Sequence, residues 1–256
     1  MATISRRDGR TAREMRGKEL RTSDLSQFDG SAWYSQGLTA VTVAINGPTA
    51  ARQENYRRCT TCIHVNRAAR IPQEGGTGRL IMMERRERER CEDGELKQFL
   101  TSLVEAIVCL DRFPRCVLEA HVTVLMDDGA LFAVASNAIM CALLDAGVPC
   151  RSTIAAVSLI MCNPEASGNE GEPEIFLDPT AVEESTDEVR SYASATFVLT
   201  NTGGEAVLAS RVQARPRSSA YSRSITPKDL SRMFALAAKA AETLFVFFRN
   251  CSMALE

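Results

Sequence analysis

The segment that most constrains the fold is a 14-residue run, Leu131–Leu144, that is rich in alanine and apolar on nearly every side. It ends at Asp145, and it is shorter than the roughly 18 apolar residues that a membrane-spanning helix needs. A helix that is apolar all round must be covered on every side by other elements. We therefore predict a buried helix through the middle of a layered molecule, with Gly147 at its C-terminal stop.

Strand and helix patterns precede this segment. Apolar residues at helical spacing predict a helix over Glu95–Leu110 that starts at Asp93 or Gly94. Short runs of β-branched and aromatic residues predict strands, and Asn46-Gly47-Pro48 closes the first hairpin. We expect these strands at residues 31–35, 39–45, 60–65 and 117–125.

A second set of strands and a helix follows Pro149. The chain is expected to form strands at residues 153–162, 174–177, 193–200 and 205–212, with an acidic loop at 163–173. Thr226 as N-cap and Pro227 as first residue predict a C-terminal helix. Strands followed by helices, twice over, favour an α/β (α+β) chain with two β-α halves. We expect a basic N-terminal arm (1–24), a first half (25–150), a second half (151–250) and a tail (251–256).

The charges indicate an anionic partner. The 30 basic residues comprise 26 Arg and four Lys, and arginine favours planar, bidentate contact with phosphates and carboxylates. The net charge of −2 conceals a basic N-terminal third and an acidic stretch at residues 164–190. The start, MATISRRDGR, has no apolar run, so we expect no secretory signal. Nine cysteines in such a chain favour free thiols in a reducing compartment, the cytosol or the nucleus.

Few residues are candidates for catalysis or for metal binding. Cys59 and Cys62 are three positions apart, which on a strand places the thiols on opposite faces, and no second pair completes a zinc site. We interpret them as free thiols, and His64 and His121 as sheet histidines. The glycines at 75–78 lack the Lys-Ser/Thr ending of a phosphate-binding loop. No metal and no cofactor are predicted.

A run of alternating charge at Glu84–Arg90 has two interpretations. It is either the solvated start of a helix, with Glu and Arg supporting each other at offsets of three and four, or an arginine cluster that faces RNA. Other arginines of the same basic segment favour contact with backbone phosphates and little base preference. Arg67, Arg70 and Arg79 are the predicted RNA contacts.

Several strings, in their order along residues 6–250, resemble the RNase PH family. They are Arg7-Asp8-Gly9-Arg10, Asp29-Gly30-Ser31-Ala32, Gln36-Gly37-x-Thr39-x-Val41, Asn46-Gly47-Pro48, Asp128-Gly129, the run from Asn137-Ala138 to Val148-Pro149, and Leu177-Asp178-Pro179-Thr180. The resemblance implies an RNase PH-type fold, ribosomal protein S5 domain 2-like, with two RNase PH-like β-α halves. It also implies a hexameric ring threaded by RNA. Active members cleave RNA from its 3′ end with inorganic phosphate as nucleophile.

Compared with active members, this chain lacks the groups that bind phosphate. The family's Gly-Thr-Arg falls on Gly129-Ala130-Leu131, so a hydroxyl and a guanidinium are replaced by side chains that cannot bind phosphate. The family's catalytic Asp falls on Ser194, and the Asn two residues later falls on Thr196. A further phosphate-binding Arg, expected just before the first long helix, falls near Cys91-Glu92-Asp93, with Arg90 close by. Acidic groups there would repel phosphate.

Some acidic residues of the family's site region remain. Asp178, Glu183 and Glu184 are expected to form a solvated acidic patch rather than a two-metal nuclease centre.

The resemblance therefore implies a non-catalytic RNase PH-like subunit of the eukaryotic RNA exosome core ring. Such a subunit would assemble the ring and line its RNA channel in the nucleus, nucleolus and cytoplasm. The implied partners are other RNase PH-like subunits, especially ribosomal RNA-processing protein 43, the cap subunits and single-stranded RNA, and no membrane. Two alternatives are a phosphate-dependent 3′-to-5′ exoribonuclease with a rearranged site and a metal-dependent hydrolase that uses Asp178 and Glu184.

Overall fold

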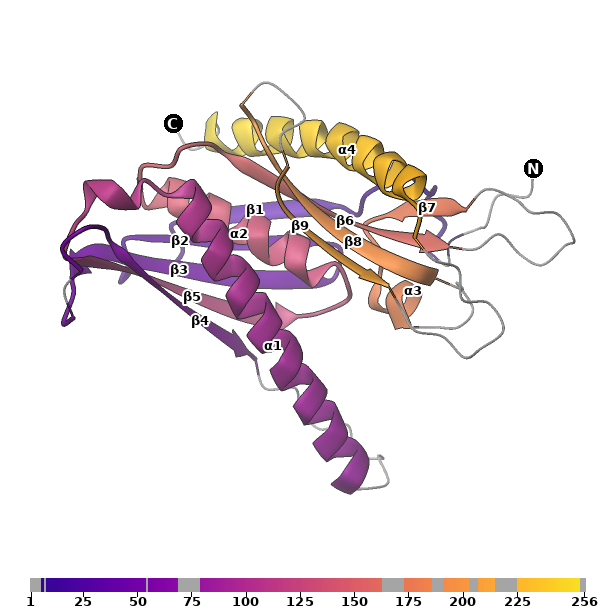
Figure 1. The fold of residues 1–256 in the computed structure, drawn as a ribbon, viewed down its shortest axis with the longest axis horizontal. Coiled ribbons are helices and arrows are strands. Elements are labelled where there is room, and N and C mark those ends of the chain that lie inside the picture. Colours follow the sequence, from indigo (N-terminus) through magenta and orange to yellow (C-terminus); the bar gives the residue numbers. More distant parts are fainter. Residues whose placement is uncertain are drawn as a thin grey trace, which may run out of the picture.

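The computed structural model describes residues 6, 8–53, 55–68, 79–162, 173–185, 191–202, 207–214 and 225–253, with only the backbone at 79–89, 185 and 252–253. These residues form two sheets and three long helices (Figure 1). The first half contains β1 (Lys18–Thr22), β2 (Gly30–Gln36), β3 (Thr39–Ala50), β4 (Thr60–Arg67), α1 (Arg79–Ile107), a short 3-10 turn (Leu110–Arg112), β5 (Cys116–Met126) and α2 (Leu131–Asp145). The second half contains β6 (Ile154–Cys162), β7 (Glu174–Leu177), α3 (Ala181–Ser185), β8 (Ser191–Thr200), β9 (Val207–Ala214) and α4 (Pro227–Met253).

The first sheet has the strand order β1-β2-β3-β5-β4. Antiparallel pairing joins β1 to β2, β2 to β3 and β3 to β5, whereas β4 runs parallel to β5. A parallel neighbour needs a long crossover connection, and α1 lies in the connection from β4 to β5. The predicted hairpin of β2 and β3 is confirmed, but β3 does not end at Asn46. It passes Gly47 and Pro48 with an irregularity in register and continues to Ala50.

The second sheet has the strand order β7-β6-β8-β9, and all of its pairs are antiparallel. Every residue of β6 is buried, as expected for a strand without alternating polar positions. The predicted hairpin of β8 and β9 is confirmed. The mixed α/β architecture with two β-α halves is therefore the one expected from the order of the segments.

Helix α2 lies between the two sheets and holds the halves together. It contacts β2 and β3 of the first sheet and β6 of the second, and it is buried from Leu131 to Leu143 apart from Phe132. Figure 1 shows α2 below β6 and β8, and α4 along their upper side. Phe247 and Phe248 of α4 also contact Tyr34 of β2. The buried central helix predicted from its all-round apolar surface is confirmed, with Gly147 in the left-handed region (φ +63°).

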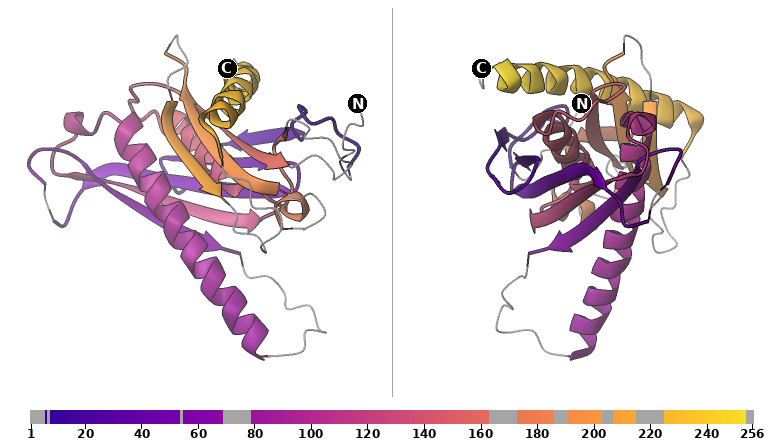
Figure 2. Two further views of the ribbon diagram at one scale, coloured as in Figure 1. Left: turned by 45° about the vertical axis from the view of Figure 1, so that its right-hand side comes forward. Right: turned by 90° about the vertical axis from the view of Figure 1, so that its left-hand side faces the viewer.

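Helix α1 begins earlier than predicted. It starts at Arg79 rather than at Asp93 or Gly94, so the charged run at residues 84–90 lies within the helix. Figure 2 shows the N-terminal part of α1 projecting away from the sheets. The apolar spacing that predicted Glu95–Leu110 marks only the part that packs on the body, where Leu96, Leu100 and Leu103 are buried.

The basic N-terminal segment packs onto the molecule itself. Its last part forms β1, at the edge of the first sheet. Arg6 and Arg16 are buried, and the amide of Leu177 donates to the carbonyl of Ala12 beside the short edge strand β7. Two arginines that the sequence placed in an arm are therefore part of the interior, and the edge of β7 is covered.

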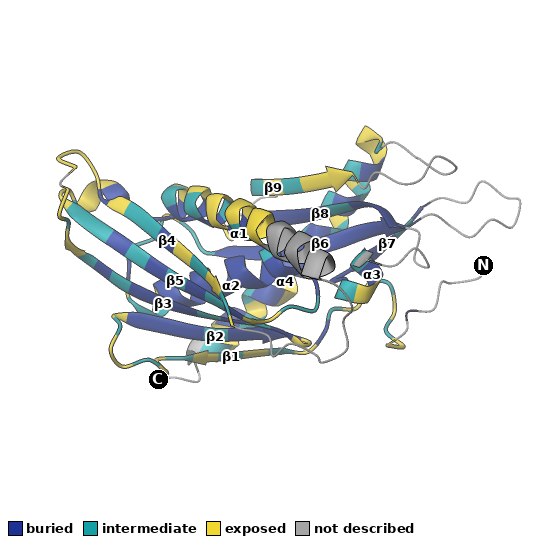
Figure 3. Ribbon diagram, turned by 90° about the horizontal axis from the view of Figure 1, so that it is seen from below, coloured by how far each residue is buried: buried dark blue, intermediate teal, exposed yellow. Residues whose placement is uncertain are grey.

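Buried and exposed residues are distributed unevenly over the strands of the two sheets. Seen from below, β6 and β8 of the second sheet are almost entirely buried, whereas the edge strand β9 carries exposed residues, as do β4 and β1 at the two edges of the first sheet (Figure 3). Among the described residues, no helix combines the length and the apolar character needed to span a bilayer.

Candidate active-site pocket

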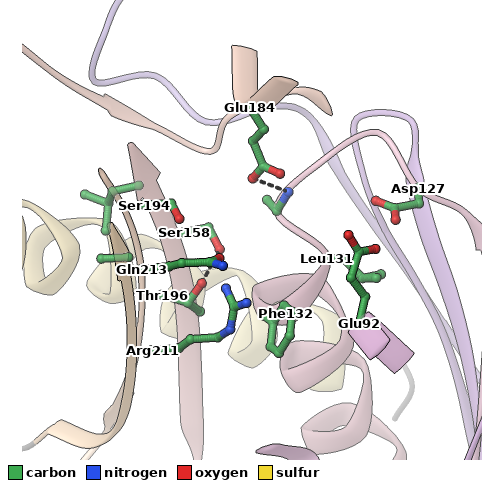
Figure 4. Close-up of a pocket in the computed structure, with 13 residues that line it drawn as sticks. Glu92, Asp127, Leu131, Phe132, Ser158, Glu184, Ser194, Thr196, Arg211 and Gln213 are labelled. Carbon is green, nitrogen blue, oxygen red and sulfur yellow. Dashed lines mark hydrogen bonds between the residues drawn. The ribbon is translucent and has the colours of Figure 1, made fainter. Parts of the chain in front are cut away.

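A pocket lies where the two halves meet. It has a volume of about 160 Å³. The first half contributes the end of β5, the start of α2 and a turn of α1, and the second half contributes α3, β6, β8 and β9 (Figure 4). The lining residues are Glu92, Asp127, Ala130, Leu131, Phe132, Ser158, Leu159, Glu184, Ser194, Ala195, Thr196, Arg211 and Gln213.

The turn before α2 is fixed by backbone geometry and by side chains from distant segments. Gly129 has φ +88°, and a Cβ atom there would lie 2.6 Å from backbone atoms of residues 179–181, so only glycine fits. The hydroxyl of Thr39 donates to the carbonyl of Gly129 at 2.7 Å and accepts from the amide of Asp128 at 3.0 Å. Arg16 donates to the carbonyl of Asp128 at 2.9 Å.

The backbone amide that follows this glycine donates a hydrogen bond to a carboxylate of the same chain. The N–H of Ala130, at the N-cap of α2, donates to Oε1 of Glu184 at 3.2 Å (Figure 4). The N-terminus of a helix favours negative charge, which is why anions bind there. In this chain the negative charge comes from α3 of the second half.

The opposite wall of the pocket is formed by hydroxyl and amide groups from the second sheet. The hydroxyls of Ser158 and Thr196 are 2.8 Å apart, and Ser194 and Gln213 lie beside them (Figure 4). Ser194 pairs with Gln213 across β8 and β9, which explains why both line the same wall. This wall provides hydrogen-bonding groups and no carboxylate.

Arg211 is the one arginine among the described lining residues. Its guanidinium carbon lies 4.2 Å from the centroid of the Phe132 ring, and Nη2 donates to Glu95 at 2.8 Å. A cation over an aromatic face is held by the quadrupole of the ring. Arg211 is therefore fixed at the pocket wall, and part of its charge is compensated by Glu95.

The acidic side of the pocket is tied to Arg67. Nε of Arg67 donates to Asp93 at 2.6 Å, and Nη1 donates to Asp127 at 2.9 Å. Nη2 lies 3.5 Å from Glu92. Burial lowers the pKa of the guanidinium, but its bonds to Asp93 and Asp127 outweigh this effect and raise the pKa. Arg67 thus joins the end of β4 to α1 and to the end of β5.

The structure brings together most of the positions at which the sequence departs from active RNase PH members. Ala130, Leu131, Ser194 and Thr196 all line the pocket, with Glu184 beside them. Glu92 also lines it, although residues 91–93 lie inside α1 and not before it. Arg90 is exposed on the same helix and is not among the lining residues.

The prediction of a solvated acidic patch is wrong for Asp178 and Glu183. Asp178 is 1% exposed and Glu183 is 4% exposed. Arg16 contacts Asp178 at 2.6 Å, and Arg6 contacts Glu183 at 2.6 Å. Burial alone would raise the pKa of Asp178, but the hydrogen bonds and the charge of Arg16 hold it below its usual value. The physical reason for the correction is that two arginines from the N-terminal segment neutralise these carboxylates.

The three arginines predicted to contact RNA differ in what the structure describes. Arg67 is mostly buried among three carboxylates. Arg79 lies at the first turn of α1, with only its backbone described, and Arg70 lies outside the described residues. The RNA contacts at these positions stay a prediction.

Sequence reasoning missed seven of the lining residues, which are Asp127, Phe132, Ser158, Leu159, Ala195, Arg211 and Gln213. Ser158, Phe132, Gln213 and Arg211 carried no motif, because each is an ordinary residue in a strand or helix pattern. A signal for two of them lay in β9. Residues two apart on a strand share a face, so the predicted strand already placed Arg211 and Gln213 on the same side of the sheet.

Known proteins resemble this chain in sequence and in fold. Residues 14–149 match the family described as "3′ exoribonuclease family, domain 1", RNase_PH. The "Exosome complex exonuclease RRP46 homolog" of Arabidopsis thaliana is 30% identical over 181 residues, which cover 71% of this chain and 66% of that protein. The "Exosome complex component RRP41" of Homo sapiens is 33% identical over 152 residues, which cover 59% and 60%. The chain thus spans less than two thirds of the length of these relatives.

A solved structure has the same fold. The crystal structure of rice (Oryza sativa) Rrp46 matches with a TM-score of 0.72 at 21% identity, over 95% of this chain and 98% of that one. The RNase PH-type fold expected from the sequence motifs is confirmed.

Proposed function

The chain belongs to the RNase PH family of 3′ exoribonucleases, and from this premise we propose that it is a non-catalytic RNase PH-like subunit of the RNA exosome core ring. Its relatives named as exosome components support the assignment to the exosome. The residues of the pocket support the absence of catalysis. In the ring, the subunit contributes architecture and part of an RNA path while another subunit or an attached nuclease cleaves.

The observation that carries the proposal is the hydrogen bond from the amide of Ala130 to Glu184. Phosphorolysis needs cations and backbone donors that hold inorganic phosphate beside the scissile bond. At this turn, Ala130 and Leu131 replace the family's Thr and Arg, and the amide of Ala130 already binds a carboxylate. To bind this amide, a phosphate ion would have to displace the carboxylate of Glu184. Both groups are negatively charged, so they repel each other.

The charge balance of the pocket supports the same conclusion. The described lining residues include the three carboxylates of Glu92, Asp127 and Glu184 and one guanidinium, that of Arg211. Inorganic phosphate carries at least one negative charge at neutral pH, so this balance disfavours its binding. Ser194 at the position of the family's catalytic Asp cannot act as a general acid near neutral pH.

The proposed partners follow from the proposed ring. Other RNase PH-like subunits, ribosomal RNA-processing protein 43 in particular, and the cap subunits are the expected neighbours, and single-stranded RNA is the expected ligand. Nucleus, nucleolus and cytoplasm are the proposed locations. Affinity purification of the chain from cells, followed by identification of the bound proteins, is expected to recover exosome subunits. Recovery of the chain as a free homo-oligomer without them would contradict the proposed assembly.

A phosphorolysis assay tests the proposed absence of catalysis. Purified chain is incubated with labelled single-stranded RNA, with and without inorganic phosphate, and the released nucleotides are separated. We expect no phosphate-dependent release of nucleoside diphosphates. Phosphate-dependent release that Arg211→Gln abolishes and Arg21→Gln preserves would show a working site, because Arg21 is exposed on β1 away from the pocket lining.

The second candidate is a phosphate-dependent exoribonuclease with a rearranged site. Arg211 favours it, because a guanidinium on the pocket wall can bind phosphate, and the Arabidopsis relative bears the name exonuclease. The assay separates it from metal-dependent hydrolysis, which would release nucleoside monophosphates and require manganese or magnesium. Hydrolysis through Asp178 and Glu184 is less well supported, since Asp178 is engaged by Arg16.

A further inference from the structure

A cluster of metal-ligating side chains lies on the first sheet, on the face that points away from the core. Along β4, Ile63 is buried, and Cys62 and His64 on either side of it point to the other face. In the register of the parallel strands, Cys62 lies opposite Glu119 of β5, and His64 lies opposite His121. Directly opposed residues share a face, so Cys62, His64, Glu119 and His121 lie on one surface, across the edge strand β4 and its neighbour β5.

The distances within this cluster are short. Sγ of Cys62 lies 3.3 Å from Nε2 of His64. The rings of His64 and His121 are nearly parallel, at 13°, with their centroids 5.0 Å apart. His64 is exposed, and Cys62 and His121 are half-buried. The cluster therefore combines a thiol and two imidazoles within reach of solvent.

Thiolate and imidazole are the preferred ligands of zinc. Zinc binds sulfur at about 2.3 Å and nitrogen at about 2.0 Å, so the two ligand atoms of one tetrahedral ion lie about 3.5 Å apart. The separation of 3.3 Å between Cys62 and His64 is close to this value. We propose that Cys62, His64 and His121 form a binding site for Zn²⁺ across β4 and β5, with the fourth position filled by water.

The proposal needs one local movement. Within the described parts of the chain, no group of three His, Cys, Asp or Glu side chains is placed so that it could hold a metal ion without such a movement. The His121 ring must turn out of its stack with His64 so that a ring nitrogen faces the ion. The rotation gives up the stack with His64 and the contact with the Phe28 ring at 5.9 Å, and none of these three rings belongs to the buried core. The site differs from a Cys59–Cys62 pair, because Cys59 is buried.

A bound ion would join an edge strand to the rest of the sheet. In the described sheet, β4 has β5 as its one strand neighbour, and ligands on both strands would tie them together. A ligand that binds only the folded protein raises its stability. The proposed site is therefore a stabilising clip, and it does not depend on the function proposed for the pocket.

Cobalt and zinc titrations of the full chain test the proposal. Co²⁺ bound by a thiolate gives a sulfur-to-metal charge-transfer band. One equivalent of Zn²⁺ is expected to displace the Co²⁺ and to abolish this band. We expect Cys62→Ser to remove the band and His64→Gln or His121→Gln to weaken Co²⁺ affinity at least tenfold. Cys91→Ser is the matched control, because Cys91 is an exposed cysteine on α1, and it is expected to leave the titration unchanged.

Two results would overturn the proposal. One is the absence of a charge-transfer band in the unsubstituted chain, or a band that survives Cys62→Ser. The other is unchanged affinity in His121→Gln, which would remove the third ligand. Circular dichroism spectra of each metal-free variant establish that it is folded, and the midpoint of thermal unfolding with and without Zn²⁺ gives a second readout. We expect Zn²⁺ to raise the midpoint of the unsubstituted chain and not that of Cys62→Ser.

Discussion

At the scale of single residues, buried ion pairs decide the environment of the carboxylates near the pocket. Asp178 accepts from the backbone amide of Arg16 at 2.8 Å and from its guanidinium at 2.6 and 2.9 Å. Glu183 is held in the same way by Arg6. Breaking such a pair leaves an uncompensated charge in the interior, and this loss is larger than the pair's own net contribution. The two carboxylates therefore anchor the N-terminal segment.

Asp178→Asn is expected to destabilise the fold by about 3 to 5 kcal/mol, because it removes the main counter-charge of the buried Arg16 and leaves only the longer contact with Asp128 at 3.5 Å. Urea unfolding at neutral pH measures the change. Glu19→Gln, which removes an exposed pair with Arg21, is the control and is expected to change the free energy of unfolding by less than about 0.5 kcal/mol. Equal effects of the two substitutions would contradict the role of Asp178.

The same pair predicts a pH dependence. The folded state lowers the pKa of Asp178, so its contribution is fully present above the unfolded pKa of about 3.9 and is lost as the pH falls through the folded value. The gap in stability between the unsubstituted chain and Asp178→Asn is therefore expected to be full at pH 7 and to shrink below about pH 4. A gap that stays constant on acidification would show that the carboxylate charge does not stabilise the fold.

At the scale of helices and strands, local sequence patterns predicted those elements whose buried side the pattern itself records. The periodicity of apolar residues gave the strands and helices because burial repeats with the period of each element. The start of α1 could not be predicted in this way, since its first turns project from the body and the apolar run at 80–83 is followed by charged residues from Glu84 to Arg90. The burial of Asp178 and Glu183 was equally hidden, because Arg16 and Arg6 lie 162 and 177 positions away in the chain.

The start of α4 tests the capping pattern read from the sequence. The amide of Asp229 donates to the hydroxyl of Thr226 at 3.3 Å, and the amide of Thr226 donates to the carboxylate of Asp229 at 3.1 Å. Thr226→Ala removes the first bond and is expected to cost about 1 kcal/mol in urea unfolding. Ser231→Ala, on an exposed side of the same helix, is the control. A control that costs as much as Thr226→Ala would show that the cap contributes nothing.

At the scale of the whole molecule, the pocket exists because two halves meet at α2. The sequence located Ala130, Leu131, Ser194 and Glu184 separately, through the family resemblance, and the fold brings them to one place. The sequence did not identify Arg211 as a pocket residue, because no local pattern shows which strand residues meet where the two halves pack together. The basic segment at 52–90 also reaches the acidic side of the pocket, because Arg67 contacts Glu92 and Asp127 of the lining.

RNA binding by the basic segment is tested through its salt dependence. Each phosphate contact contributes about 0.7 to the slope of log affinity against log salt for a single strand. Neutralising Arg67, Arg70 and Arg79 together is expected to weaken RNA binding and to reduce this slope. Arg67→Gln alone is expected to lower stability and to leave the slope unchanged, because three carboxylates already compensate its charge. An unchanged slope in the triple variant would remove these arginines from the RNA path.

Calorimetric titration of the purified chain with inorganic phosphate measures whether the turn before α2 binds phosphate. We predict no saturable binding at millimolar phosphate, because Glu184 holds the amide of Ala130 and the turn carries Ala130 and Leu131 where the family has Thr and Arg. Saturable binding that is lost in Arg211→Gln and kept in Arg21→Gln would contradict this prediction and would identify a working anion site.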